Sequence, residues 1–241
     1  MKSIVHYSIA IALSLLSINI GFSQNKRVKG NGNVTTKTTT TEDYNEIEVV
    51  DFMYVTLESG TEGTITVSAE DNIHEYVEIE SKNGVLKLKI KNNVNISTKY
   101  GVRITVPFTD INRVSLTGSG DVDSKTTINA THFNTEITGS GDIKLDVKAN
   151  SIDAKLTGSG DLILTGNVSE LEIKVTGSGD FVAKNLKAEN VEAYVSGSGD
   201  ISVYATKKLK ARVHGSGDIT YSGNPETTDK KVMGSGDITS H

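Results

Sequence analysis

Apolar and polar residues alternate along much of the chain, in short runs that repeat. In residues 171–180, Leu171, Ile173 and Val175 are apolar and the residues between them are polar. A period of two residues is that of a β-strand with one face in a core and the other in solvent. The recurrence predicts a series of equivalent strands. The inward set occurs as Ile152, Ala154 and Leu156; as Leu171, Ile173 and Val175; as Val191, Ala193 and Val195; and as Leu209, Ala211 and Val213.

A tetrapeptide, Gly-Ser-Gly-Asp, marks the same place in each repeat. It occurs seven times, at intervals of 21, 19, 19, 20, 18 and 19 residues. Identical tetrapeptides at near-constant spacing do not arise by chance, so the chain is predicted to be a repeat protein.

The alternation continues through this motif without a change of phase. If Val175 points inward, so do Gly177 and Gly179, whereas Ser178 and Asp180 point outward. The motif therefore predicts a bend in a continuing strand rather than a reversing hairpin, with glycine where an inward side chain would collide. The predicted structural corners are Gly118, Gly120, Gly139, Gly141, Gly158, Gly160, Gly177, Gly179, Gly197, Gly199, Gly215, Gly217, Gly234 and Gly236.

Repeats that all run in the same direction favour helical coils over hairpins. Each strand would pair in parallel with its copy one coil on, at about 4.8 Å, so seven coils would rise about 30 Å. One coil cannot bury its apolar residues alone, but a stack gives a continuous core. We therefore predict an all-β fold, a parallel β-helix of about seven coils of about 19 residues with polar return loops. The alternative is a β-sandwich or β-prism of hairpins.

The segment before the repeats also alternates but lacks the motif. Residues 44–116 contain several such runs, and Asn83-Gly84 is a hairpin signal between two of them. These strands would be antiparallel or would form larger coils that cap the stack. No linker precedes Gly118, so residues 44–241 are expected to form one domain, with the repeats at 118–241.

Residues 24–43 are predicted to be a polar, Thr-rich linker or a loose strand.

Residues 1–23 have the features of a secretory signal. Lys2 supplies a positive start, residues 9–20 are mostly apolar, and Gly21 and Ser23 are the small residues that cleavage before Gln24 requires. The apolar run is too short and too interrupted for a bilayer span of about 20 residues, and no other segment is apolar enough. The protein is therefore expected to be exported, to the periplasm, the outer surface or the medium.

Composition removes several classes of function. The chain has no Cys, which excludes disulfides, Cys-ligated metals and a lipoprotein anchor. Without the signal it keeps 24 Lys and Arg against 30 Asp and Glu, a formal charge of −6. This acidity argues against nucleic acid as a partner.

The outward aspartates of the motifs would stack as a column of carboxylates. Like charges at strand spacing repel, so hydrogen bonds, solvent or cations must offset them. Ser and Asp commonly satisfy backbone groups in turns, and that role is favoured. Calcium is the alternative, because it prefers oxygen ligands; no other cofactor is expected. The calcium candidates are Asp121, Asp142, Asp161, Asp180, Asp200, Asp218 and Asp237.

No arrangement typical of an active site stands out. The histidines are scattered, the carboxylates are regular rather than singular, and no Trp offers a platform for sugars. We predict a non-catalytic protein. The alternative is a β-helical lyase or hydrolase that acts on polysaccharides.

The whole pattern resembles the bacterial family named putative auto-transporter adhesin, head GIN domain. The resemblance is carried by the Gly-Ser-Gly-Asp repeats, by the strands at 103–107 and 114–117 before them, and by the upstream run from residue 45. It covers about residues 40–240. It implies a right-handed parallel β-helix and an exported, adhesin-like protein, and it brings no catalytic residues. Many relatives look like lipoproteins, which this Cys-free chain does not.

The predicted function is thus an adhesin-like binding or structural β-helix of the cell envelope that presents a repetitive Thr/Ser/Asp face. Its partner would be an envelope glycan or protein. Weak homo-oligomerisation is also expected, through the open strand edge of the last coil.

Overall fold

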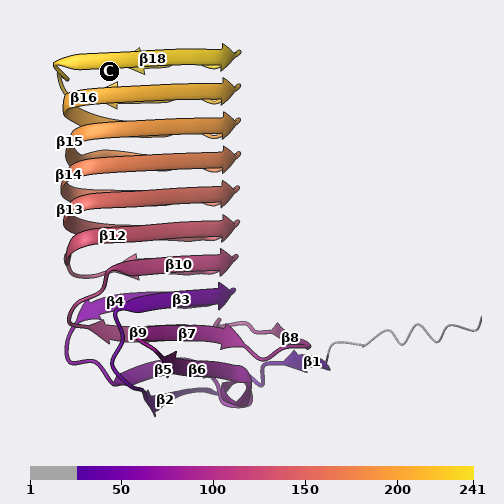
Figure 1. The fold of residues 1–241 in the computed structure, drawn as a ribbon. Coiled ribbons are helices and arrows are strands. Elements are labelled where there is room, and N and C mark those ends of the chain that lie inside the picture. The colour runs from indigo at the N-terminus through magenta and orange to yellow at the C-terminus, as the bar shows by residue number, and fades with distance from the viewer. Residues whose placement is uncertain (1–25) are drawn as a thin grey trace, which may run out of the picture.

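The computed structural model describes residues 26–241, and these form a parallel β-helix (Figure 1). The predicted signal segment, residues 1–23, lies outside the described residues. Within residues 26–241, no helix is long and apolar enough to cross a membrane. The elements are β1 (Lys26–Lys29), β2 (Val34–Thr40), β3 (Glu46–Asp51), β4 (Tyr54–Ser59), β5 (Thr64–Glu70), the 3-10 turn η1 (His74–Tyr76), β6 (Val77–Lys82), β7 (Val85–Ile90), β8 (Val94–Ser97), β9 (Arg103–Phe108), β10 (Arg113–Gly118), β11 (Asp121–Ser124), β12 (Ile128–Gly139), β13 (Asp142–Gly158), β14 (Leu162–Gly177), β15 (Phe181–Gly197), β16 (Ile201–Gly215), β17 (Ile219–Ser222), β18 (Thr227–Gly234) and β19 (Ile238–Ser240).

Each long strand runs from one Gly-Ser-Gly-Asp motif to the next and so makes one coil. Strands β12 to β16 pair with their neighbours in parallel, and equivalent residues of successive repeats are partners. The seven motifs therefore lie above one another along one edge of the stack, where the arrowheads align in Figure 1. The predicted parallel coils are confirmed, and the alternative of stacked hairpins is wrong for this region because parallel partners cannot be joined by tight turns.

The core consists of columns of aliphatic side chains that run through the stack. One column is Ile137, Leu156, Val175, Val195 and Val213, all of them buried. Each such side chain contributes about 1.5–3 kcal/mol when it is buried, and it is the neighbouring coils that bury it. The stack, rather than the single repeat, is therefore the unit that folds.

In the last coil, a polar side chain ends one column of the core. This column contains Ile173, Ala193 and Ala211, and Lys230 occupies the next position in β18. Nζ of Lys230 lies 4.3 Å from the ring centre of Tyr221. A cation over an aromatic face is favourable and needs no further layer above it. One core column is thus covered at this end by a Lys-Tyr contact, whereas the column that ends in Val232 is left exposed. Self-association through the outer edge of β18 stays a prediction.

Differences in repeat length are absorbed between each motif and the middle of the coil that follows it. The β14–β15 pairing shifts register between Ile163 and Thr165, and the β15–β16 pairing shifts between Ala183 and Lys187 and between Ala188 and Asn190. We call the curved segment midway between two motifs the return bend. The residues before each motif keep their register throughout.

The stack continues below the first motif in strands that carry no motif. Strands β3 and β4 pair in parallel under β10 and β11, and β7 and β9 pair in parallel under β3 and β4. Asp51, with φ of 83°, lies in register below Gly118. Its carbonyl oxygen accepts the N–H groups of Ser119 (3.0 Å) and Gly120 (2.9 Å). A short polar residue tolerates this left-handed backbone better than most, so the corner persists without glycine.

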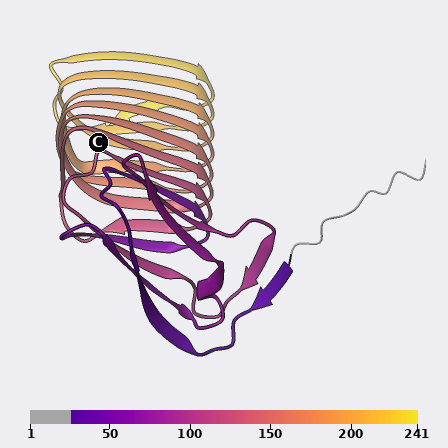
Figure 2. The same ribbon diagram turned by 60° about the horizontal axis from the view of Figure 1, so that its bottom comes forward.

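Antiparallel strands close the N-terminal end. Strand β2 pairs with β5, and β5 pairs with β9, beside the base of the stack (Figure 2). Residues 34–40, within the segment read as a linker or loose strand, are therefore part of the main sheet. Asn83 and Gly84 have positive φ between the antiparallel β6 and β7, which confirms the hairpin turn.

The corners depend on backbone contact that only glycine permits. The carbonyl oxygen of Gly158 accepts both the Ser178 N–H (2.9 Å) and the Gly179 N–H (3.1 Å) of the next coil. A Cβ on Gly177, where φ is +123°, would lie 2.3 Å from that oxygen. A Cβ on Gly179 would lie 2.1 Å from the Gly160 oxygen. Both glycine columns therefore lie in direct backbone contact from coil to coil.

Replacing Gly177 by Val is expected to lower the free energy of unfolding by roughly 2–6 kcal/mol, because overpacking costs about 1–3 kcal/mol and a strained backbone costs a similar amount. Thr176→Val is the matched control, one residue earlier and exposed, and should change stability by less than about 0.5 kcal/mol. Urea unfolding followed by circular dichroism compares the two. A Gly177→Val protein as stable as the parent would contradict the close contact.

Candidate functional site

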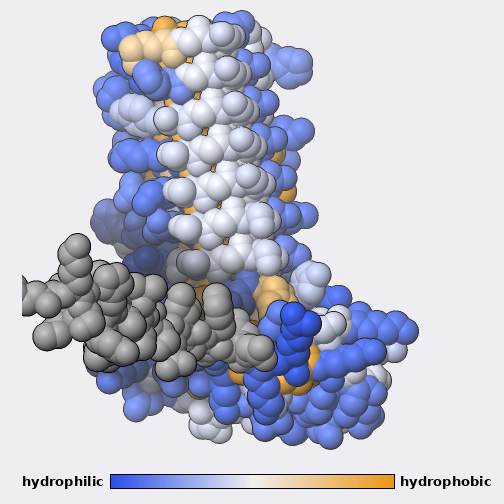
Figure 3. Space-filling model, turned by 90° about the vertical axis from the view of Figure 1, so that its right-hand side faces the viewer, coloured by the Kyte–Doolittle hydropathy of each residue, from blue (hydrophilic) through white to orange (hydrophobic). Residues whose placement is uncertain are grey.

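The edge formed by the motifs presents columns of small polar side chains, which we call the corner face. Figure 3 shows it as a pale band that runs up the stack between hydrophilic flanks. The first column of the band follows the strand register. That column is Val50, Thr117, Thr138, Thr157, Thr176, Ser196, His214 and Met233.

The aspartates of the corner face replace a missing backbone acceptor. In the first two coils the N–H groups of Asp121 and Asp142 donate to carbonyl oxygens of the coil below, at 2.9 and 3.1 Å. In the next five coils the N–H instead donates to Oδ1 of the preceding aspartate. These bonds join Asp161 to Asp142 (2.8 Å), Asp180 to Asp161 (3.2 Å), Asp200 to Asp180 (2.9 Å), Asp218 to Asp200 (2.8 Å) and Asp237 to Asp218 (2.7 Å).

Repulsion within this column is evident at its lower end. The pKa of Asp121 is raised, first by burial and then by the negative charge of Asp142, while a backbone hydrogen bond from Asp142 acts in the opposite direction. Each N–H that points at a carboxylate offsets part of the repulsion. The ladder is thus held by hydrogen bonds despite its charge.

The calcium candidates contribute one carboxylate per coil to this ladder. Among residues 26–241, no group of three or more His, Asp or Glu side chains is placed to hold a metal ion. The Oδ1 atoms of Asp142, Asp161, Asp180, Asp200 and Asp218 are engaged by N–H groups. Calcium binding stays a prediction that stability measurements can test.

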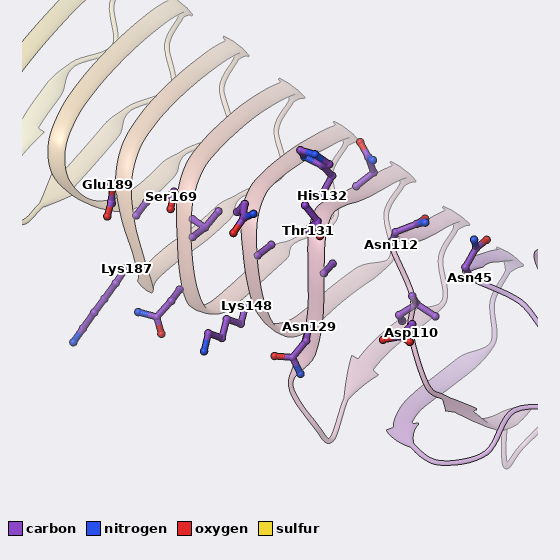
Figure 4. Close-up of a pocket in the computed structure, with 18 of the residues that line it drawn as sticks. Asn45, Asp110, Asn112, Asn129, Thr131, His132, Lys148, Ser169, Lys187 and Glu189 are labelled. Carbon is purple, nitrogen blue, oxygen red and sulfur yellow. The ribbon is translucent and has the colours of Figure 1, made fainter.

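A long hollow lies on the return bends, midway between successive motifs. It is an open groove of about 1170 Å³ that runs along the stack from Asn45 to Thr206 (Figure 4). We call it the return-edge groove. Its lining includes no residue of the seven motifs.

The floor of the groove is one column of small apolar residues. Ala130, Ala149, Val168 and Ala188 are strand partners in successive coils, and Val168 and Ala188 are buried. Because these side chains are short, they leave the longer polar side chains on both sides standing as walls. Figure 4 shows two rows of such side chains along the stack.

The walls differ in chemistry. One wall is Asn129, Lys148, Asn167 and Lys187, which are strand partners in that order and are exposed. The other wall is Thr131, Asn150, Ser169 and Glu189. The carboxylate of Glu189 is paired with Lys207 at 2.7 Å. Uncharged hydrogen-bonding groups therefore dominate the second wall.

Sequence reasoning identified the corner face but missed this groove. The signal was present as a second repeat, a small apolar residue between two polar ones in each coil. The tripeptides are Asn129-Ala-Thr, Lys148-Ala-Asn, Asn167-Val-Ser and Lys187-Ala-Glu. Each tripeptide begins 10 residues before the next motif, but its residue types vary from coil to coil, so it is harder to recognise than Gly-Ser-Gly-Asp.

The described residues bring one histidine to a hydroxyl near the groove. Nδ1 of His132 lies 2.6 Å from Oγ of Ser151. In the strand register, Ser151 separates His132 from Glu170. A nucleophile with a general base needs the acid on the far side of the histidine, so this order does not match a catalytic triad.

The aspartate ladder predicts different effects for two substitutions of Asp180. Asp180→Asn keeps an acceptor oxygen for the Asp200 N–H and should change the free energy of unfolding by less than about 0.5 kcal/mol. Asp180→Ala removes the acceptor and should cost about 1 kcal/mol. Thermal melts with and without EDTA measure both. A melting temperature of the parent that falls in EDTA, with a smaller fall for Asp180→Asn, would establish calcium binding instead.

The raised pKa of Asp121 predicts a stability that depends on pH. Its charged form is less favourable in the folded state than in the unfolded state, so Asp121→Asn should be more stable than the parent at pH 7. The gain should disappear as the pH falls below the ordinary aspartate value of 3.8, where both states are protonated. Urea unfolding at pH 7 and pH 3 tests this. A variant less stable than the parent at pH 7 would contradict it.

Comparison with known proteins supplies the family. A family model described as putative auto-transporter adhesin, head GIN domain matches residues 43–225. A putative adhesin from Bacteroides fragilis is 24% identical, with a TM-score of 0.85 over 89% of this chain and 100% of that one. A putative lipid binding protein from Parabacteroides distasonis is 28% identical, with a TM-score of 0.74 over 90% and 100%. A putative adhesin from the same species is 26% identical, with a TM-score of 0.72 over 90% and 100%.

No curated protein matches the sequence. The family match nevertheless covers well over half of the chain and takes in both the motif coils and the strands beneath them. The resemblance drawn from the repeats is confirmed, and the chain belongs to the putative auto-transporter adhesin, head GIN domain family.

Proposed function

We propose that the protein is a non-catalytic binding module, exported to the cell envelope, that holds a partner along the return-edge groove. The observation that carries the proposal is the groove itself, about 1170 Å³ in volume and built across successive coils. Its floor and one wall lie on paired strands, so the polar groups are held at fixed spacing. A rigid scaffold of this kind suits recognition of an extended partner.

The corner face is less suited to binding. Its carboxylates already accept N–H groups from the next coil, and its glycines pack backbone against backbone. A ligand there would compete with bonds that hold the corners. The exposed side chains of Asn150 and Asn167 in the groove can instead turn their donors and acceptors to a partner.

The names of related structures agree with a binding role and leave the class of ligand open. Two are named as adhesins and one as a lipid binding protein. An acyl chain would need a broad apolar lining. Here the apolar floor is a single column between polar walls, which favours a polar partner.

The absence of Cys from the chain allows a direct test. Asn167→Cys and Thr176→Cys place single thiols on the same strand, β14, one in the groove and one on the corner face. Each is coupled to a bulky maleimide reagent. Binding to isolated cell envelopes and to a glycan array should fall at least tenfold for the label at 167 and stay unchanged for the label at 176.

Each alternative has its own outcome in this experiment. Loss of binding only with the label at 176 would assign the function to the corner face. Equal binding by both labelled proteins would refute the groove. Release of reducing ends from a polysaccharide by the unlabelled protein would establish the enzyme, and binding only to lipid vesicles would establish a lipid ligand.

A further inference from the structure

The charged groups of the return-edge groove are arranged unequally. The first wall alternates uncharged and positive side chains in the order Asn129, Lys148, Asn167, Lys187. Two coil spacings separate the lysines, about 10 Å. In Figure 4, Lys148 and Lys187 extend in the same direction from neighbouring parts of the stack.

These two lysines differ from several other lysines of the stack, which form ion pairs. Lys155 pairs with Glu136 at 3.0 Å, Lys210 with Glu192 at 2.9 Å and Lys207 with Glu189 at 2.7 Å. Lys148 and Lys187 form no ion pair with any side chain of residues 26–241, although they lie in the same stack. Their charge is therefore available to a ligand.

The other charges of the groove do not cancel this field. The negative charge of Glu189 is taken up by Lys207. Asp110 lies at the N-terminal end of the groove, beside Asn112 rather than between the lysines. His132, next to Thr131 of the second wall, is hydrogen-bonded to Ser151. The middle of the groove is thus positive on a protein that is acidic overall.

Amide side chains lie between the two lysines, at Asn167, and opposite Lys148, at Asn150. Asn150 and Asn167 are exposed in the groove, and each amide offers two donors and one acceptor oxygen. Sugar hydroxyl groups both donate and accept, so a row of amides suits them. A partner that matches both features is a linear chain with hydroxyl groups throughout and a negative charge on alternate units.

We propose, on the basis of the groove function above, that the ligand is a linear acidic glycan with a carboxylate on every second sugar. The carboxylates lie on Lys148 and Lys187, and the uncharged sugars lie against Asn129 and Asn167. The glycan runs parallel to the axis of the stack, because the lysines follow one another in that direction.

The test uses hyaluronan octasaccharide, which has one carboxylate per disaccharide, and an uncharged cello-oligosaccharide of the same length. Lys148→Gln with Lys187→Gln is expected to weaken hyaluronan binding about tenfold, as two exposed ion pairs would. Lys144→Gln with Lys184→Gln is the matched control. It removes the same charge from exposed residues of the same strands, β13 and β15, outside the groove, and should leave binding unchanged. Isothermal titration calorimetry measures all three proteins.

Several results would overturn the proposal. They are equal loss in both double variants, cello-oligosaccharide binding as tight as hyaluronan binding, or equal binding of a single-stranded DNA of similar charge. If hyaluronan does not bind while the label at Asn167→Cys still blocks envelope binding, the ligand class is wrong and the groove function stands. If neither label affects envelope binding, the groove function itself is wrong.

Discussion

The fold depends on the direct contact of backbones at the corners. One glycine carbonyl receives two N–H groups from the coil above, as between Gly158 and Ser178 and Gly179. This contact fixes the relative position of successive coils, because a side chain at Gly177 would collide with the Gly158 carbonyl oxygen. The aliphatic columns can then meet in register, and so can the groove walls half a coil away. Burial of apolar side chains supplies the stabilising free energy. The corner contacts set the register, and so determine which side chains are buried against one another.

The same constraint explains why the corner edge and the return edge of the stack have different roles. At the corner edge the side chains of Asp161, Asp180 and their equivalents are used within the protein, because their coils lack a carbonyl acceptor there. At the return edge the backbone is satisfied by ordinary parallel pairing. Residues such as Lys148 and Asn167 are therefore free to vary in chemistry without a cost to the corners.

The parallel coils could be predicted from the sequence, but the groove and the pairing of the strands before the first motif could not. The corner could be identified because residues equivalent to Val175, Gly177 and Gly179 recur in the same order in successive repeats. A steric requirement for glycine applies at the same position in every coil. The sequence leaves the coil of β3 and β4 open between antiparallel strands and capping coils, because Asp51 and Met53 occupy the glycine positions. The groove escaped notice because the residues beside its column, which includes Ala149 and Val168, differ in type from coil to coil although their register is constant. The pairing of these strands could not be predicted from local sequence patterns. Strand β9 pairs with β4 on one side, and the chain then continues into β10, which pairs with β3 on the other side.

The absorption of length differences between a motif and the middle of the next coil has a consequence for how such proteins diversify. An insertion that falls there leaves the corners unchanged, as the intervals of 18 to 20 residues around Gly197 already show. Duplication of a whole repeat would lengthen the return edge by one rung of about 4.8 Å. Each rung adds one more contact to a partner that is already held, so avidity would change in discrete steps with gene length. The number of repeats would then set the length of partner that the groove contacts, and the three groove residues of each repeat would set which partner it binds.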